Sequence, residues 1–266
     1  MNEENCVIIV PTHSSYLDVV KNFMILEKKY WSDCKYKIIV AITGEDISVP
    51  SINTLYCGRN ATLPLCIYLA CQKCKAQYYM CFLGDAFINS KVNNKAVEYL
   101  IHSMKKNNLD FLRIRTLHSM FKKKSINKYM RYINSADRYA HSFIAFVASQ
   151  KFIEEEFSGV VTDLDFENKY LEMTTIRPRF YFENHAIVTK RIFDIYPGII
   201  KGKWDCWIYF LLKIKNPELD FKTRKILPLK DNVYCWCADF FIKFIPDTIR
   251  KKVKKHTKNK MMVTKD

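Results

Sequence analysis

The chain has few residues that break regular structure, with only 6 glycines and 8 prolines among 266 residues. This scarcity excludes a collagen-like or low-complexity chain. No apolar run reaches the roughly 18 residues that a membrane-spanning helix needs. The acidic start, Met1–Cys6, lacks the basic residues of a signal peptide. We therefore expect a cytoplasmic protein.

What the chain does contain indicates a globular, basic protein. Hydrophobic residues make up 49% of the sequence, aromatic residues make up 14%, and the formal net charge is +16. Such a charge attracts nucleic acid, anionic membrane or phosphorylated ligands, and it does not choose among them. The 10 cysteines, in a chain without an export signal, are expected to be reduced core thiols. Cys71 and Cys74 have a zinc-like spacing but no second pair follows, and Cys235-Trp236-Cys237 has the alternation of a strand.

The order of the expected elements favours an α/β fold. Cys6–Val10 reads as a buried strand, residues 16–30 as a helix with apolar residues at helical spacing, and Lys37–Ile42 as a second strand. A strand, a helix and a strand over so short a stretch predict parallel pairing. The later expected elements are a short strand at 54–57, a helix from Thr62 to Lys75, a strand at 78–83, a helix at 92–106 and a strand at 110–114. We predict a mostly parallel sheet with helices on both faces.

The second half is less regular. Residues 140–150 fit a strand or a helix, residues 162–167 an acidic loop, and residues 204–214 a helix. Phe180–Val188 reads as a strand that leads into a helix from about Thr189. With no internal repeat and no linker, we expect one domain over residues 1–240 and an appended tail at 241–266.

The most informative segment is Tyr78–Ile88, an apolar run that contains one acidic residue, Asp85. A carboxylate at the C-terminal end of a strand lies at the edge where open α/β sheets bind ligands. Asp85 could hold a divalent metal there and, through the metal, a diphosphate. The alternative is an ordinary turn residue or the cap of the next helix.

Two motifs carry a resemblance to a known family. The first strand ends in Val10-Pro11-Thr12-His13, and a later strand runs into Phe82–Phe87. Over residues 1–115 the chain resembles the GT-A glycosyltransferases, and among them the small bacterial enzymes that build capsular and other surface polysaccharides. The resemblance implies a GT-A-like, Rossmann-like fold. It also implies a nucleotide-sugar half at 1–115 and a less regular acceptor half at 116–240.

The resemblance also implies a hexosyltransferase-like enzyme, retaining or inverting, that uses Mn²⁺ or Mg²⁺ at Asp85. Cleaving the bond between sugar and phosphate builds negative charge on the diphosphate, which a divalent cation can neutralise. The chain departs from the family at this point, because Gly84 stands where a first aspartate is common. Either the metal site has few protein ligands, or basic residues replace the metal, or the site has lost its function.

Other residues after the expected strands complete a candidate nucleotide site. Thr12 and His13 would lie near the base or ribose, or they form a capped turn. Glu45 follows the second strand and could accept hydrogen bonds from the ribose, or it lies in a solvated loop. Arg59 follows the possible third strand and could reach a phosphate, or it is a surface arginine.

A general base would take a proton from the acceptor hydroxyl. The resemblance implies a Trp-acidic element in the second half, and the nearest match, Gly202–Trp207, offers Asp205 as this base. Asp205 could equally be a helix-terminal acid that offsets the helix dipole. His185 fits a metal ligand, an acceptor contact or a core histidine. The rivals for the base are Asp163, Asp165 and Glu183.

The tail at 241–266 combines bulky apolar residues with the basic run Arg250–Lys260. This combination fits either an anionic membrane surface or a docked helix with a solvated end. We therefore predict a peripheral enzyme on the cytoplasmic membrane face that transfers a sugar to a growing, lipid-linked glycan. The alternatives are a non-enzymatic nucleic-acid binder, which the missing interleaving of basic and aromatic residues disfavours, and a decayed glycosyltransferase that serves as an assembly partner.

Overall fold

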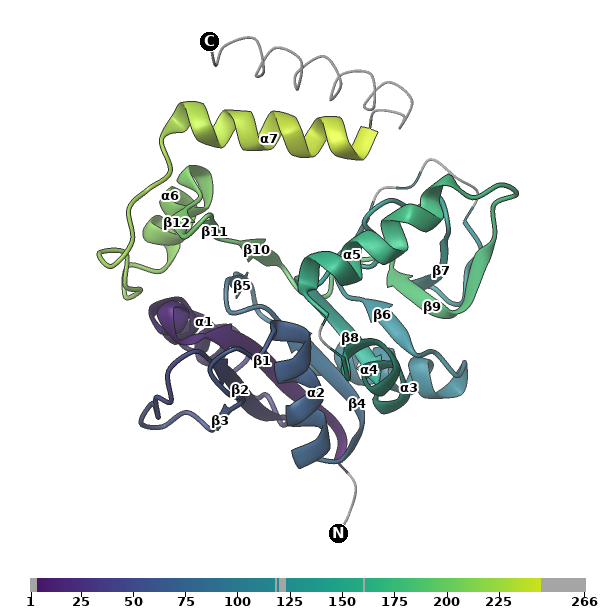
Figure 1. Cartoon of the computed structure of the whole chain (residues 1–266), viewed down its shortest axis with the longest axis horizontal. Coiled ribbons are helices and arrows are strands. Elements are labelled where there is room, and N and C mark those ends of the chain that lie inside the picture. The colour runs from purple at the N-terminus through teal and green to yellow at the C-terminus, as the bar shows by residue number, and fades with distance from the viewer. Residues whose placement is uncertain (1–3, 118, 120–122, 160, 245–266) are drawn as a thin grey trace.

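A computed structural model describes residues 4–117, 119, 123–159 and 161–244. Its main feature is a sheet of eight strands in the order β3-β2-β1-β4-β8-β6-β9-β7 (Figure 1). The strands are β1 (Glu4–His13), β2 (Lys37–Thr43), β3 (Thr54–Tyr56), β4 (Ala76–Phe82), β6 (Phe111–Arg113), β7 (Met130–Asn134), β8 (Ala145–Ser149) and β9 (Tyr181–Val188).

Most strands of this sheet run in the same direction. The pairs β1–β2, β2–β3, β1–β4 and β6–β9 are parallel. Strand β8 is antiparallel to both of its neighbours, β4 and β6, and β7 is antiparallel to β9. Since β4 and β6 are both antiparallel to β8, they run in the same direction as each other. Strands β4, β6 and β9 therefore share the direction of β1. The prediction of a mostly parallel α/β sheet is confirmed.

Helices cover both faces of the sheet, as predicted. The alternation of β1 sends Ile8 and Val10 to one face and Val7 and Ile9 to the other, and all four are buried. Helices α1 (Leu17–Tyr30) and α3 (Asn94–Lys106) pack on the first face. The second face carries α2 (Leu63–Lys73), α4 (Gln150–Phe157) and α5 (Asp163–Glu172). Two hydrophobic cores, one on each face, hold the sheet between the helices.

Three expectations for the second half are wrong. The acidic stretch 162–167 begins α5, because Thr162 and Asp165 cap each other's backbone N–H groups in a capping box. The segment after Val188 forms no helix from Thr189, and it leads into the short strand β10 (Ile195–Pro197), which pairs with β5 (Ala86–Ile88). Residues 235–237 lie in the helix α7 (Leu229–Phe244) rather than in a strand. The ambiguous stretch 140–150 contains the strand β8.

The remaining elements extend from β10 to one end of the molecule (Figure 1). They are the strands β11 (Ile199–Ile200) and β12 (Lys203–Trp204) and the helices α6 (Cys206–Lys215) and α7. Short 3-10 helices occupy residues Ser14–Tyr16 and Met173–Thr175. Strands from both predicted halves belong to one sheet. The boundary at residue 115 stays a prediction. The predicted tail begins within α7, and its residues from 245 on lie outside the described residues.

Among the described residues, the helices include none with the length and hydrophobicity that a bilayer span requires.

Candidate functional site

The C-terminal ends of the parallel strands meet at one edge of the sheet. His13 at the end of β1 lies opposite Thr43 at the end of β2, and β3 and β4 end at the same edge. All of the residues that the sequence predicts for the nucleotide site follow or end these strands. The sheet therefore brings their backbones to a common edge, where ligands of open α/β sheets bind.

Thr12 and the turn after β4 are in close contact. A β-carbon built on Gly84 would lie 3.7 Å from Thr12 Oγ1 and 2.8 Å from Val20 Cγ2. Asp85 is the next residue, so the structure brings the ends of β1 and β4 together as the sequence predicts. The contact also explains why a glycine fits at position 84, because Val20 of α1 occupies the space that a side chain would need.

His13 and Glu45 form a second group at this edge. Glu45 N–H donates to Ser14 Oγ at 3.0 Å, and Gly44, with φ of +93°, lies directly against the His13 ring. His13 Nδ1 accepts a hydrogen bond from Ser15 N–H at 3.1 Å, so this nitrogen caps the short helix at Ser14–Tyr16. His13 therefore forms the capped turn, and its ring is also exposed at the end of the strand. The second ring nitrogen, Nε2, faces Gly44.

Arg59 is near the edge but separate from the other candidates. Its carbonyl accepts from Thr43 Oγ1 at 3.4 Å, while its side chain is exposed. The backbone of Arg59 thus lies beside the end of β2, and the role of its side chain as a phosphate ligand stays a prediction.

The Asp85 carboxyl has a shifted pKa. Burial raises the pKa of its carboxyl to about 6, and the hydrogen bond from Ile199 N–H and the charge of Arg115 oppose this shift. The bond from Ile199 N–H reaches Asp85 Oδ2 at 3.4 Å. A carboxyl group with such a pKa can change its charge near neutral pH, which is typical of functional sites.

Asp205 lies on the same side of the molecule as Asp85 because both bond to one residue, Gly198. Gly198 N–H donates to the Asp85 carbonyl at 3.1 Å, and Asp205 N–H donates to the Gly198 carbonyl at 2.8 Å. A β-carbon on Gly198 would lie 2.3 Å from Phe87 Cε2, so only glycine fits at this junction. The sequence could not indicate this link, since it depends on pairing between β5 and β10.

The Asp205 carboxylate is the N-cap of α6. Its Oδ1 accepts from Trp207 N–H at 2.9 Å and from Ile208 N–H at 3.0 Å. Asp205 therefore has the role at a helix terminus that the sequence offers as the alternative to a catalytic base. A base role remains chemically open, because both cap bonds use Oδ1 and the second carboxylate oxygen, Oδ2, takes part in neither.

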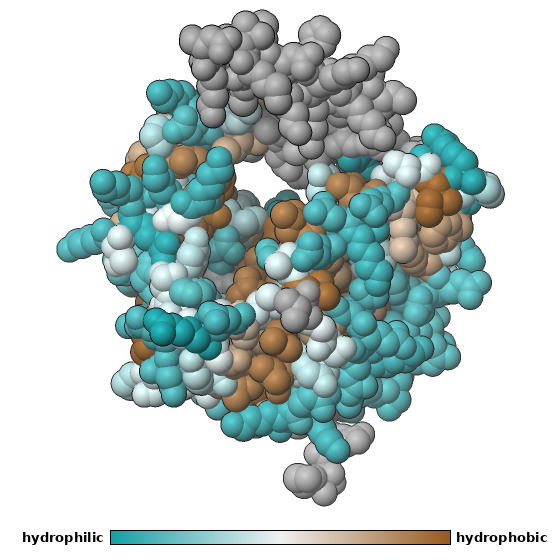
Figure 2. All heavy atoms as spheres, in the orientation of Figure 1, coloured by the Kyte–Doolittle hydropathy of each residue, from teal (hydrophilic) through white to brown (hydrophobic). Residues whose placement is uncertain are grey.

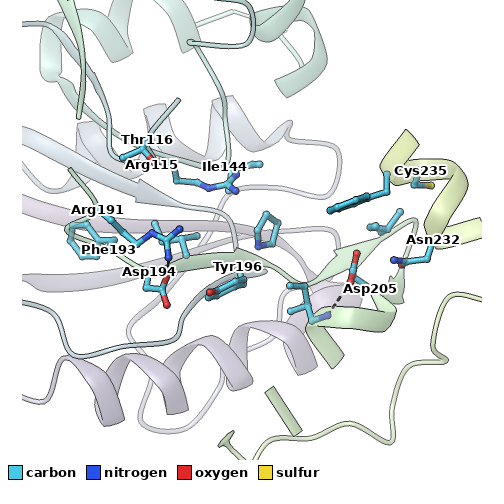
Figure 3. Close-up of a pocket in the computed structure, with 15 residues that line it drawn as sticks. Arg115, Thr116, Ile144, Arg191, Phe193, Asp194, Tyr196, Asp205, Asn232 and Cys235 are labelled. Atoms are coloured by element: carbon cyan, nitrogen blue, oxygen red, sulfur yellow. Dashed lines mark hydrogen bonds and ion pairs between the residues drawn. The ribbon is translucent and has the colours of Figure 1, made fainter. Parts of the chain in front are cut away.

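A cavity of about 460 Å³ adjoins these residues (Figure 3). Its wall at Ile144 lies beside the turn of Asp85, because Leu83 N–H donates to the Ile144 carbonyl at 2.9 Å. Figure 3 shows Arg115 and Arg191 on one side of the cavity and Asp205 on the opposite side. Arg191 forms an ion pair with Asp194 at 2.8 Å. The further lining residues include Thr116, Tyr196, Ile208, Asn232, Cys235 and Trp236.

Sequence reasoning missed Arg115 and Arg191, although a signal for both was available. Arg115 follows β6 and Arg191 follows β9, and these strands run parallel to β4. Their C-terminal ends therefore reach the same edge as Asp85. Applying the strand-end rule to the expected strands at 110–114 and 180–188 would have identified both arginines.

A resident divalent cation does not fit the side chains at Asp85. Within the described residues, no group of three or more His, Cys, Asp or Glu side chains is arranged to hold a metal ion. Mg²⁺ and Mn²⁺ favour about six oxygen ligands. Asp85 supplies one carboxylate, and Gly84 leaves no second acid beside it. Any cation at this place would take most of its ligands from a bound diphosphate and water.

The rivals for the base lie elsewhere. Asp163 is exposed in the first turn of α5, Asp165 is used in the capping box of that helix, and Glu183 lines a separate, polar hollow at the opposite edge of the sheet. His185 is a core histidine, buried and hydrogen-bonded to His141 at 2.9 Å between their ring nitrogens. Neither the three rivals nor His185 lines the cavity that contains Asp205.

No protein-family model and no curated protein matches the chain. Several solved structures are distantly similar to it. A cytidylyltransferase from Leptospira borgpetersenii serovar Hardjo-bovis is 10% identical, with 92% of this chain and 98% of that chain covered and a TM-score of 0.44. S. aureus TarS is 9% identical, with 80% of this chain but only 39% of that chain covered and a TM-score of 0.45. CMP:2-keto-3-deoxy-manno-octonic acid synthetase in complex with CTP is 10% identical, with 81% and 100% covered and a TM-score of 0.44.

Proposed function

We propose that the chain is a glycosyltransferase that moves a sugar from a nucleotide-sugar donor to a glycan acceptor. The observation that carries this proposal is the position of Asp85. Its carboxyl, with a pKa raised to about 6, follows a parallel strand at the ligand-binding edge, with Thr12 on one side and the cavity of Arg115 on the other. A half-buried acid with a shifted pKa at a ligand-binding edge is a candidate functional group.

The surrounding residues suggest a path for the donor across the edge. In this proposal the nucleoside lies along Thr12, His13 and Glu45, and its diphosphate reaches Asp85. The guanidinium of Arg115, whose charge already acts on Asp85, would balance the charge that builds on the leaving diphosphate. The protein need not hold a resident metal, but ionised Asp85 would repel the diphosphate unless Mn²⁺ or Mg²⁺ entered together with the donor.

The acceptor would enter the cavity from the side of Asp205. Its hydroxyl oxygen forms a bond to the anomeric carbon of the donor sugar, the bond from that carbon to the diphosphate oxygen breaks, and the hydroxyl proton passes to Asp205 Oδ2. We further propose a hexose as the sugar, a lipid-linked surface glycan such as a capsular polysaccharide as the acceptor, and contact of the tail at 241–266 with the cytoplasmic membrane face.

Thermal unfolding in the presence of nucleotides tests the donor site. A ligand that binds only the folded chain raises its stability, by about 2.7 kcal/mol at a concentration 100 times its Kd. We expect one nucleotide diphosphate or nucleotide sugar to raise Tm, with and without Mn²⁺, and Asp85→Asn to reduce transfer at least about tenfold. Asp163→Asn, an exposed acid on α5, is the matched control.

Two results would contradict parts of this proposal. If no nucleotide or nucleotide sugar raises Tm, the nucleotide site is refuted. If nucleotide sugars bind but Asp85→Asn transfers sugar as fast as the natural chain, Asp85 has no part in catalysis. Binding without any transfer by the natural chain would instead support the decayed enzyme, which the missing acid at Gly84 favours.

A further inference from the structure

Helix α6 is apolar on two faces, and only one of them is covered. Tyr209 and Leu212 are buried against the protein, whereas three large apolar side chains on the other side are exposed. These are Trp207 at 61%, Phe210 at 52% and Ile214 at 82% exposure. Their spacing of three and four residues places them in one stripe along the helix. A helix that is hydrophobic all round is normally buried or in contact with a membrane.

The charges around this stripe are of one sign. Lys213 and Lys215 are exposed in the last turn of α6, and the helix contains no acidic residue. At 3.6 residues per turn, the two lysines flank the stripe on opposite sides. Lys213 Nζ lies 3.1 Å from the Tyr209 hydroxyl, so its stem runs along the side of the helix. Exposed apolar side chains with lysines on both sides are typical of helices that lie in an anionic lipid surface.

From these observations we propose that the stripe of Trp207, Phe210 and Ile214 docks on an anionic lipid bilayer, with Lys213 and Lys215 at the lipid phosphates. A second copy of the chain suits the stripe poorly, because two chains with a net charge of +16 each repel one another. In Figure 2, apolar residues stand among hydrophilic ones in the region of α6.

The stripe would also orient the proposed site. Asp205 caps the same helix, and Ile208 in its first turn lines the cavity. With α6 in the lipid surface, the cavity would open close to the headgroups, where the sugar of a lipid-linked acceptor lies. This step deepens the proposed function and rests on it, while docking itself does not require transfer activity.

Intrinsic fluorescence tests the proposal without a label. The chain has 4 tryptophans, of which Trp31 and Trp204 are each only 1% exposed, while Trp207 is 61% and Trp236 is 73% exposed. The full-length chain is mixed with vesicles of phosphatidylcholine alone or with phosphatidylglycerol, in which brominated acyl chains quench any tryptophan that inserts. We expect quenching in the anionic vesicles only, lost in Trp207→Phe and retained in Trp236→Phe.

A second variant separates the stripe from every other membrane contact. Phe210→Ser combined with Ile214→Ser should lower partitioning into anionic vesicles at least about tenfold, since each side chain loses most of its burial in lipid. Leu164→Ser, which removes a 63% exposed leucine from α5, should leave it unchanged.

Binding to vesicles without quenching of Trp207, or equal partitioning of the double variant and the natural chain, would overturn the proposal. A dimer that the double variant abolishes, with no vesicle binding, would overturn it in favour of a second copy. All vesicle measurements omit nucleotide, so their failure is distinct from failure of the proposed sugar transfer.

Discussion

Lowering the pH from about 7.5 to 5 should cost the folded chain about 2 kcal/mol through His185 alone. His185 and His141 are buried, with 2.9 Å between His185 Nδ1 and His141 Nε2. Tyr170 stacks on the ring of His141 with centroids 3.6 Å apart, and Phe182 lies parallel to His185. The bond between the rings requires one nitrogen to donate and the other to accept, so protonating the acceptor breaks it.

The magnitude follows from the pKa of His185. Burial, only partly opposed by the charge of Asp110, lowers this pKa to about 4, whereas an unfolded histidine titrates near 6.5. Between these values the unfolded chain binds a proton that the folded chain does not, so stability falls as the pH falls through this window. At about pH 5 the difference amounts to about 1.5 pKa units, or about 2 kcal/mol. His141 acts in the same direction, because burial holds its pKa well below the ordinary value.

Urea unfolding at the two pH values measures this loss in the natural chain and in His185→Gln, whose amide does not titrate. The variant should lose about 2 kcal/mol less than the natural chain between the two conditions. Taking the difference between the two proteins removes the contribution of Asp85 and the other acids. His102→Gln, on an exposed position of α3, is the matched control. An equal loss in the natural chain and His185→Gln would refute the reasoning.

Three further outcomes follow from the site. Gly198→Ala should cost about 1–3 kcal/mol in urea unfolding, since its β-carbon would lie 2.3 Å from a buried phenylalanine ring. Gly159→Ala, with its nearest neighbour at 4.0 Å, should cost far less, and equal losses would contradict the close approach. Gly84→Asp should destabilise the chain and lower Tm, and Val20→Ala should recover part of the loss by removing the methyl group 2.8 Å away. If Val20→Ala recovered none of the lost stability, Val20 would not be the side chain that excludes an aspartate at position 84. Without metal, affinity for a nucleotide sugar should fall as the pH rises through about 6, because ionised Asp85 repels the diphosphate, and Asp85→Asn should abolish this step in a calorimetric titration.

The sheet was predictable because its first strands are short, apolar and separated by helices with clear ends. Thr62 illustrates this point: its hydroxyl accepts from Leu65 N–H, and Pro64 stands in the first turn of α2, as the sequence suggests. Parallel strands then fix the common edge, so Thr12, His13 and Glu45 could be placed near one another from local patterns alone.

The second half was harder because its elements depend on partners far away in the sequence. Strand β10 exists through its pairing with β5, and no local alternation marks it. The capping box of Thr162 and Asp165 did carry a local signal, which the acidic composition of that stretch obscured. In α7, two cysteines flanking Trp236 imitate the alternation of a strand although the segment is helical.

The two acids that the sequence singled out meet through a residue that it did not. Asp85 and Asp205 each make a backbone hydrogen bond to Gly198, and Gly198 lies against the rings of Phe87 and Trp204, whose centroids are 5.5 Å apart. Both acids therefore depend on the same packed junction rather than on each other. A change at Gly198 should disturb the diphosphate side and the acceptor side together, whereas a change at either acid should disturb only its own side.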